Sequence, residues 1–201
     1  MKEKMNLLAG YLGKLDPDCK TSIFVDSGPV LEKAWAQRTG VGWQGKNTLL
    51  INKNAGSFFF IGIIFTDLVA DYDLPEQDHC GTCTKCLDAC PTGALTAPYE
   101  LDPSRCIAYH TIEAHEEIPS EIIKNLNDRI FGCDICQDVC PFNRFSIPNR
   151  ELGFHPSPAL LSMRKKDWQS LSKEKFNSLF KNSSIKRTGY DKIMSTIRVT
   201  K

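Results

Sequence analysis

The first part of the chain carries two kinds of hydrophobic pattern. At its start, apolar residues recur every three to four positions, which predicts an amphipathic helix. The residues in this pattern are Met5, Leu7, Leu8, Tyr11 and Leu12. The β-branched run 22–26 predicts a strand. Because proline favours the first position of a helix, Pro29 predicts a helix over 29–38. Helix and strand therefore alternate here, as in an α/β fold.

Beyond this point the pattern predicts a hairpin and then shorter elements. Strands are expected over 48–52 and 57–66, and the turn at 53–56 would pair them. A helix is expected over 118–129. After a loop over 146–158, short apolar and Lys-rich stretches alternate, which indicates small helices.

The length of 201 residues, 41 % of them hydrophobic, suffices for one or two small domains. We predict an α+β fold with a partial α/β domain over 1–70, a cysteine-rich domain over 71–152 and a small basic helical segment over 153–201. The longest apolar stretch, 58–65, is too short to cross a bilayer. The opening residues carry no apolar signal region. We therefore expect a cytoplasmic monomer that does not associate with membranes.

The formal net charge of +1 conceals an uneven distribution. Residues 80–160 contain eleven acidic and six basic side chains, a net charge of −5. Residues 161–201 contain eleven basic and three acidic side chains, a net charge of +8. A basic segment of this kind suits a polyanionic partner such as nucleic acid. Helices whose lysines are merely solvated would show the same charge.

Eight of the nine cysteines form two runs and one isolated position. The first run has the spacing C-x2-C-x2-C-x3-C-P of bacterial ferredoxins, in which the fourth thiolate binds the other of two iron–sulfur clusters. The second run is one ligand short, and Cys106 would supply it. The first predicted cluster takes Cys80, Cys83, Cys86 and Cys140. The second takes Cys90, Cys106, Cys133 and Cys136.

Zinc and disulfides are the alternative interpretations of these cysteines. The pairs Cys80/Cys83 and Cys133/Cys136 alone would suit a zinc ribbon. However, zinc needs only four sulfurs, and the full three-cysteine run followed by x3-Cys-Pro is specific to ferredoxins. Disulfides are disfavoured because no segment directs the chain to an oxidising compartment. Cys19, outside both runs, is expected to be a free structural thiol.

Two further motifs could carry chemistry. Asp26 ends a predicted strand where the chain turns into a helix, a place where α/β folds expose reactive side chains. It is a candidate acid or base, although an Asp before Ser-Gly-Pro also commonly stabilises a turn through its own side chain.

The second motif is the glycine-rich stretch 40–48, which contains G-x-G-x-x-G and nearly matches a Walker sequence. Both nucleotide motifs need a strand before and a helix after, and here the predicted order is reversed. NAD and ATP sites are therefore rejected. What remains is a loop of exposed backbone amides beside Trp43, Lys46 and Asn47, suited to a phosphate-bearing or amide-rich ligand. Alternatively, its glycines serve only a tight connection.

Five segments together resemble the epoxyqueuosine reductase family, in order and over nearly the whole chain. These segments are 24–35, 40–47, 79–95, 104–109 and 132–143. The resemblance implies a cobalamin-dependent enzyme with two 4Fe-4S clusters. It would reduce epoxyqueuosine to queuosine in the wobble position of tRNA, with electrons from a flavodoxin or ferredoxin. A two-cluster ferredoxin-like electron carrier and a reductive dehalogenase-like cobalamin enzyme remain alternatives.

The resemblance also assigns roles to residues. It implies that Asp26 donates a proton, a role that needs a protonated carboxyl, favoured by burial or by a neighbouring negative charge. Cobalamin contacts are expected from Trp43, Gly45, Lys46 and Asn47. Contacts to tRNA are expected from Lys165, Lys166, Lys186 and Arg187. The four histidines, His79, His110, His115 and His155, are not assigned to cobalt.

Members of this family normally carry roughly a hundred further residues before the position that corresponds to Met1. Those residues include part of the cobalamin-binding domain. The resemblance therefore implies that this chain holds only part of that domain and is inactive if its corrin site is incomplete.

Overall fold

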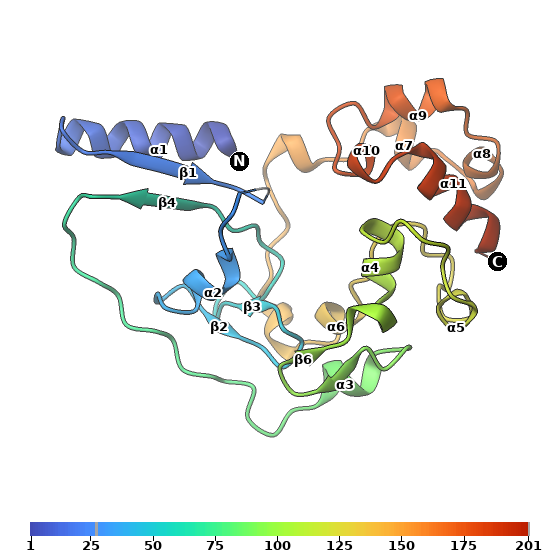
Figure 1. Cartoon of the computed structure of the whole chain (residues 1–201), viewed down its shortest axis with the longest axis horizontal. Helices are drawn as coiled ribbons and strands as arrows, with labels where there is room; N and C mark the ends of the chain where they lie inside the picture. The colour runs from blue at the N-terminus through green and yellow to red at the C-terminus, as the bar shows by residue number, and fades with distance from the viewer. Residues whose placement is uncertain (27, 201) are drawn as a thin grey trace. The chain divides into compact units, whose positions relative to one another are not determined.

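The computed structural model describes residues 1–26 and 28–200 (Figure 1). By their internal contacts, these residues form two compact units. The first unit comprises Met1–Thr84 and Cys140–Ser146. The second comprises Lys85–Val139 and the chain from Ile147 onward. The cysteine-rich segment, expected as one domain over 71–152, is thus divided between the units. The basic C-terminal part belongs to the same unit as the middle of the chain.

The first unit contains an N-terminal helix and small two-stranded sheets. Its elements are α1 (Lys2–Leu15), β1 (Thr21–Phe24), α2 (Glu32–Ala36), β2 (Trp43–Gln44), β3 (Leu50–Ile51), β4 (Ile63–Thr66) and the 3-10 helix η2 (Pro141–Phe145). The predicted opening helix is confirmed as α1. The helix expected over 29–38 is shorter, because Leu31 has φ −86° and ψ 79°, which is not helical.

The strands pair differently from the prediction. β1 pairs antiparallel with β4, and β2 pairs antiparallel with β3. The hairpin expected between 48–52 and 57–66 is wrong, and of it the described residues keep one bridge, Asn52 to Gly56. Aromatic packing favours the long-range pair, since the ring of Phe65 lies edge-on to Phe24 at 5.5 Å and to Trp35 at 5.6 Å.

The second unit is mostly helical. Its elements are α3 (Lys85–Ala89), β5 (Leu95–Ala97), β6 (Glu100–Leu101), η1 (Pro103–Arg105), α4 (Ile107–Ile112), α5 (Ser120–Ile123), α6 (Ile135–Asp138), η3 (Leu152–Phe154), α7 (Pro158–Leu161), α8 (Lys165–Gln169), α9 (Lys173–Leu179), α10 (Ile185–Thr188) and α11 (Tyr190–Val199). The helix expected over 118–129 is only α5. It cannot continue to 129, because Asn127 and Asp128 have φ of 47° and 64°.

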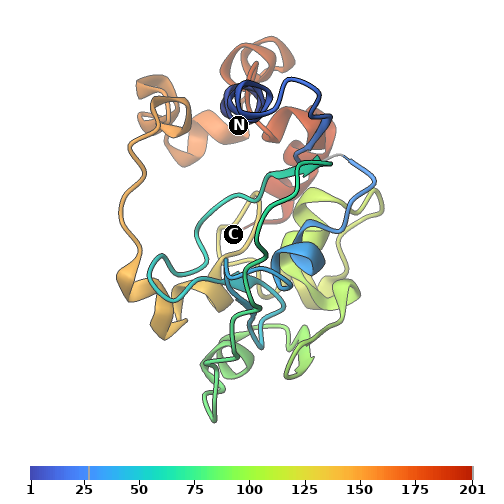
Figure 2. The same cartoon turned by 90° about the vertical axis from the view of Figure 1, so that its left-hand side faces the viewer.

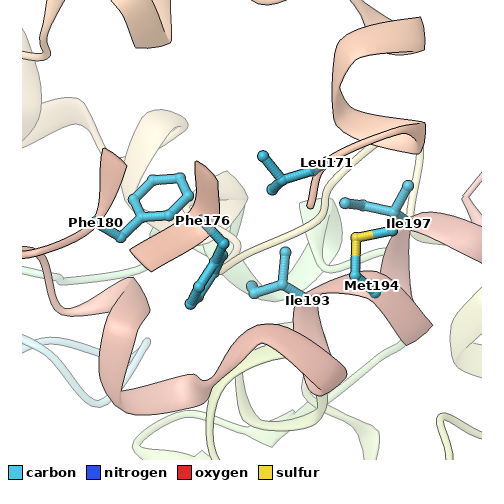
Figure 3. Packing of buried hydrophobic residues seen from close by; sticks show 6 residues of the cluster. All are labelled: Leu171, Phe176, Phe180, Ile193, Met194 and Ile197. Carbon is cyan, nitrogen blue, oxygen red and sulfur yellow. The ribbon is translucent and has the colours of Figure 1, made fainter. Parts of the chain in front are cut away.

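The larger of two buried hydrophobic clusters in the second unit lies among its C-terminal helices, which gather in both views (Figure 1, Figure 2). Figure 3 shows its six buried members, which are Leu171, Phe176, Phe180, Ile193, Met194 and Ile197. Ile130 and Phe131 pack against this cluster. These two residues directly precede Gly132 and Cys133. The hydrophobic cluster of the C-terminal helices therefore holds in place the segment that leads to Cys133.

Within the described ranges, the structure contains no helix of the length and apolar character that a membrane crossing requires.

Candidate functional site

Five of the predicted ligands belong to the second unit, and short elements position the four that are expected for the second cluster. Cys90 follows α3, Cys106 immediately precedes α4, Cys133 follows the left-handed Gly132, and Cys136 lies in α6. Helices α3 and α6 pack against one another. The isolated Cys106 lies near enough to act electrostatically on Cys133 and Cys136. Cys90 also acts on Cys133 and Cys136, so the four cysteines predicted for the second cluster lie near one another. Cys86, which is predicted for the first cluster, acts on Cys136 as well.

The thiols of these cysteines differ in the direction in which the protein shifts their pKa. Burial, followed by the negative charges of the neighbouring cysteines, raises the pKa of Cys136 to about 12. Burial also raises the pKa of Cys133. At Cys90, burial acts in the same direction, but hydrogen bonds from Thr92 and from backbone amides together outweigh it and lower the pKa. One of these donors is the backbone N–H of Ala94, 3.2 Å from the sulfur.

This arrangement fits a group that binds several thiolates at once. Four thiolates repel one another, and positive metal ions remove that repulsion when they bind. None of the nine cysteines, all of which lie in the described ranges, forms a disulfide. In the described part of the chain, no three His, Cys, Asp or Glu side chains form a group that would hold a single metal ion. An iron–sulfur cluster does not need such a group, since four cysteines share the whole cluster.

Three cysteines predicted for the first cluster, Cys80, Cys83 and Cys140, belong to the first unit. The indole N–H of Trp43 donates to the sulfur of Cys80 over 3.5 Å. The ammonium of Lys46 donates to the carbonyl oxygens of Gly81 and Cys83, at 2.5 and 3.0 Å. The fourth predicted ligand, Cys86, belongs to the second unit, and the complete ligand set of this cluster stays a prediction.

The segment after Cys140 is held by a pair of polar side chains. The Asn143 carbonyl oxygen accepts a hydrogen bond from the Ser57 backbone N–H at 2.6 Å, and the Asn143 amide donates to the Ser57 hydroxyl at 3.0 Å. The Ser146 hydroxyl donates to the carbonyl of Ala55 at 3.2 Å. Sequence reasoning missed this clamp, because its two halves lie 86 positions apart and no spacing relates them.

The glycine-rich stretch is not the exposed loop that the sequence suggested. Gly42, Trp43, Gly45, Lys46 and Asn47 are buried. The Gly45 amide donates to Leu49, and the Asn47 side chain accepts from the Leu49 amide. A side chain at Gly42 or Gly45 would collide with Ile51 of β3. The glycines therefore allow β3 to approach closely, and the amides are used inside the loop.

Asp26 is exposed and follows the end of β1. Its φ of 63° lies in the left-handed region, which Asp tolerates better than most residues. Ser27, in the middle of the predicted turn, lies outside the described residues. The Asp26 side chain therefore lacks the burial that was expected to support a proton donor.

The four predicted tRNA contacts, Lys165, Lys166, Lys186 and Arg187, are all exposed. Lys165 pairs with Asp128 at 3.4 Å, and Arg187 pairs with Glu113 at 2.6 Å. Exposed pairs of this kind contribute little stability, so a polyanion can displace them. Arg187 also lines an open groove of about 600 Å³ at the start of α11, within the second unit.

Comparison with known proteins identifies the cysteine-rich region first. Residues 79–143 match the family described as the 4Fe-4S double cluster binding domain. This match covers both cysteine runs and Cys106.

Similarity to curated proteins extends over the rest of the chain. An epoxyqueuosine reductase from Cellulophaga algicola is 48 % identical over 190 residues, which cover 94 % of this chain and 62 % of the relative. The enzyme of the same name from Cyclobacterium marinum is 48 % identical over 202 residues, covering 100 % of this chain and 63 % of the relative. The chain thus spans less than two thirds of the length of these relatives.

Solved structures of epoxyqueuosine reductases are also similar to nearly the whole chain. A crystal structure of epoxyqueuosine reductase with an epoxyqueuosine-modified tRNA-Tyr stem loop is 33 % identical, with a TM-score of 0.91. An epoxyqueuosine reductase structure from Bacillus subtilis, with its catalytic aspartate loop swung out of the active site, is 32 % identical, with a TM-score of 0.90. Each match covers 98 % of this chain and 52 % of the solved chain.

Proposed function

We propose that the chain serves in the reduction of epoxyqueuosine to queuosine in tRNA, because it is similar to epoxyqueuosine reductases over nearly its whole length. The observation that carries this proposal is the extent of the similarity. The cluster-binding family accounts only for residues 79–143, whereas the reductases match up to 100 % of the chain. An electron carrier alone would not need the segments outside the cluster region.

The reaction requires two electrons and two protons, since the epoxide oxygen leaves as water and a carbon–carbon double bond forms. We propose that the electrons arrive singly, from a flavodoxin or ferredoxin, and pass through two 4Fe-4S clusters. Cys90, Cys106, Cys133 and Cys136 would hold one cluster. Cys80, Cys83, Cys86 and Cys140 would hold the other.

Asp26 is proposed as the acid that protonates the epoxide oxygen. Opening the epoxide ring develops negative charge on that oxygen, and a positioned acid accelerates such a step by roughly 10²–10⁴-fold. The exposure of Asp26 at the end of β1 supports access to a substrate. The catalytic aspartate loop of the Bacillus subtilis relative supports the same role for a carboxylate on a movable turn.

Cobalamin enters this proposal through the resemblance to the family. When bound, it would supply a low-valent cobalt nucleophile for the epoxide carbon. The four residues expected to contact it do not fit that task, because Trp43, Gly45, Lys46 and Asn47 are buried and packed or bonded within the chain. No step is therefore assigned to those residues through cobalamin.

The substrate is proposed to be a tRNA anticodon stem loop, by analogy with the solved complex. Lys165, Lys166, Lys186 and Arg187 are exposed and would contact phosphates. Phosphate contacts position a nucleic acid without reading its sequence, so these residues would orient the stem loop and leave recognition of the modified base to other groups.

The test uses the full chain after anaerobic reconstitution with iron, sulfide and cobalamin, with dithionite as electron source. The substrate is a tRNA stem loop that carries epoxyqueuosine, and mass spectrometry detects loss of one oxygen.

The parent and the control Asp71→Asn, at another exposed aspartate, should form queuosine. Asp26→Asn should retain both clusters and form none, since Asn also tolerates the left-handed backbone. Full turnover by Asp26→Asn would remove Asp26 from the mechanism, and an inactive parent with both clusters would contradict the proposed function.

A further inference from the structure

We propose that Trp43 and Lys46 are positioning residues for the first iron–sulfur cluster, and that the Trp43 indole N–H raises the reduction potential of that cluster through its hydrogen bond to Cys80. This inference rests on the proposed function, in which Cys80 and Cys83 are cluster ligands. It gives the glycine-rich stretch a role that the sequence did not indicate. All the contacts involved lie within the first unit.

Trp43 is fixed around its hydrogen bond to the cysteine. Its side chain is only 3 % exposed, and its Nε1 lies 3.5 Å from the Cys80 sulfur. The rings of His79 and Phe142 pack edge-on against the indole, with distances between ring centroids of 4.9 and 4.8 Å. Two aromatic neighbours therefore prevent the indole from turning its N–H away from the sulfur.

The Cys80 sulfur receives a second donor from the same loop. The backbone N–H of Lys46 forms a hydrogen bond with it. The donors from Trp43 and Lys46 both favour negative charge on this sulfur, which is the charge that a cluster ligand carries.

The side chain of Lys46 holds the loop from Cys80 to Cys83, called here the cysteine loop. This residue is only 9 % exposed, and its ammonium donates to the carbonyls of Gly81 and Cys83, at 2.5 and 3.0 Å. Gly81 lies between the first two cysteines, and Cys83 is the second of them. A buried ammonium is stable only when its donors are satisfied, so the loop and Lys46 fix one another. This tether constrains the distance between the sulfurs of Cys80 and Cys83.

The effect on potential follows from charge. Reduction adds one electron to the cluster, and part of its charge resides on the cysteine sulfurs. A hydrogen bond to sulfur stabilises the reduced form more than the oxidised form, because the reduced form is more negative. Trp43→Phe keeps an aromatic ring in the same place and removes only this donor, so it should lower the potential.

The second predicted cluster provides an internal reference. Its ligands belong to the second unit, and the donors to Cys90 include Thr92 and Ala94. Trp43→Phe should therefore shift one of the two reduction steps and leave the other unchanged. A general loosening of the protein would alter both.

The measurement is a redox titration with dithionite, monitored by electron paramagnetic resonance, on the reconstituted full chain. The parent, Trp43→Phe and the control Trp35→Phe, at an exposed tryptophan, are compared. In Trp43→Phe, the ratio of reduced to oxidised cluster at a fixed potential should fall about tenfold for one cluster, equivalent to about 59 mV for a one-electron step. The control should match the parent.

A second variant keeps the inference testable if Trp43→Phe folds poorly. Lys46→Met removes the tether and should release the first cluster, which lowers the iron content by about half and abolishes one of the two reduced signals. Lys53→Met, at an exposed lysine, should retain all the iron. Two clusters with parental potentials in Trp43→Phe, or full iron in Lys46→Met, would overturn this inference alone. A parent chain that binds no iron would overturn the two-cluster assignment as well.

Discussion

The clamp between Asn143 and Ser57 leads to a quantitative prediction, because it fixes the segment that follows Cys140. Asn143→Ala removes the hydrogen bonds of the Asn143 side chain, of which the two shortest join it to Ser57. One of them is the bond from the Ser57 backbone N–H, in a residue that is only 8 % exposed. A buried amide deprived of its acceptor costs about 1–3 kcal/mol, and the second bond contributes about 0.5–1.5 kcal/mol. We expect the free energy of unfolding to fall by about 2–4 kcal/mol.

Urea denaturation of the reconstituted protein, followed by tryptophan emission, measures this change. With a urea dependence of about 2 kcal/mol per molar, the midpoint should fall by about 1–2 M. Asn54→Ala is the matched control, because Asn54 is exposed and lies in the same turn region as Ser57. It should denature like the parent. A midpoint for Asn143→Ala within about 0.2 M of the parent would refute the role of the clamp.

Three further predictions concern the cysteines and the basic segment. Cys106→Ser should retain about half of the iron and lose one of the two reduced resonance signals; retention of both would exclude Cys106 as a ligand. In the iron-free protein at about pH 8, iodoacetamide should modify Cys90 before Cys136, because a pKa of about 12 leaves only about one Cys136 thiol in 10⁴ ionised, whereas the pKa of Cys90 is lowered. Peptide mass spectrometry checks the order, and the reverse order would contradict the electrostatic description. Replacing Lys166 and Lys186 together by Glu should weaken binding of an RNA stem loop and reduce its salt dependence, whereas unchanged binding at every salt concentration would exclude phosphate contacts there.

The local features of this chain were predictable from its sequence. α1 follows from a helical repeat of apolar residues that needs no distant partner. The proximity of Cys106 to Cys133 and Cys136 follows from ligand counting, because the second run lacks one thiolate. The match of residues 79–143 to a double cluster domain agrees with that count.

Strand pairing and loop burial were not predictable in this way, because they depend on contacts between residues far apart in the sequence. The pairing of β1 with β4 depends on contacts of Phe65 with Phe24 and Trp35, far away in the sequence. The burial of the glycine-rich stretch depends on Ile51 and on the Cys80 loop, which bonds to Lys46. Hydrophobic periodicity reports the exposure of a residue within its own element and carries no information on such partners.

Electron transfer and proton donation, the two parts of the proposed chemistry, depend on different residues. Trp43 and Lys46 contact the cysteine loop, whereas Asp26 lies at the end of β1. Substitutions at Trp43 should change electron transfer without removing the proton donor. Substitutions at Asp26 should leave cluster reduction unchanged.

The most direct test of the central claim is the iron and sulfide content of the full chain after anaerobic reconstitution. Two 4Fe-4S clusters held by eight cysteines predict about eight irons and eight sulfides per chain. A content of about four irons, or of zinc without sulfide, would contradict the two-cluster account.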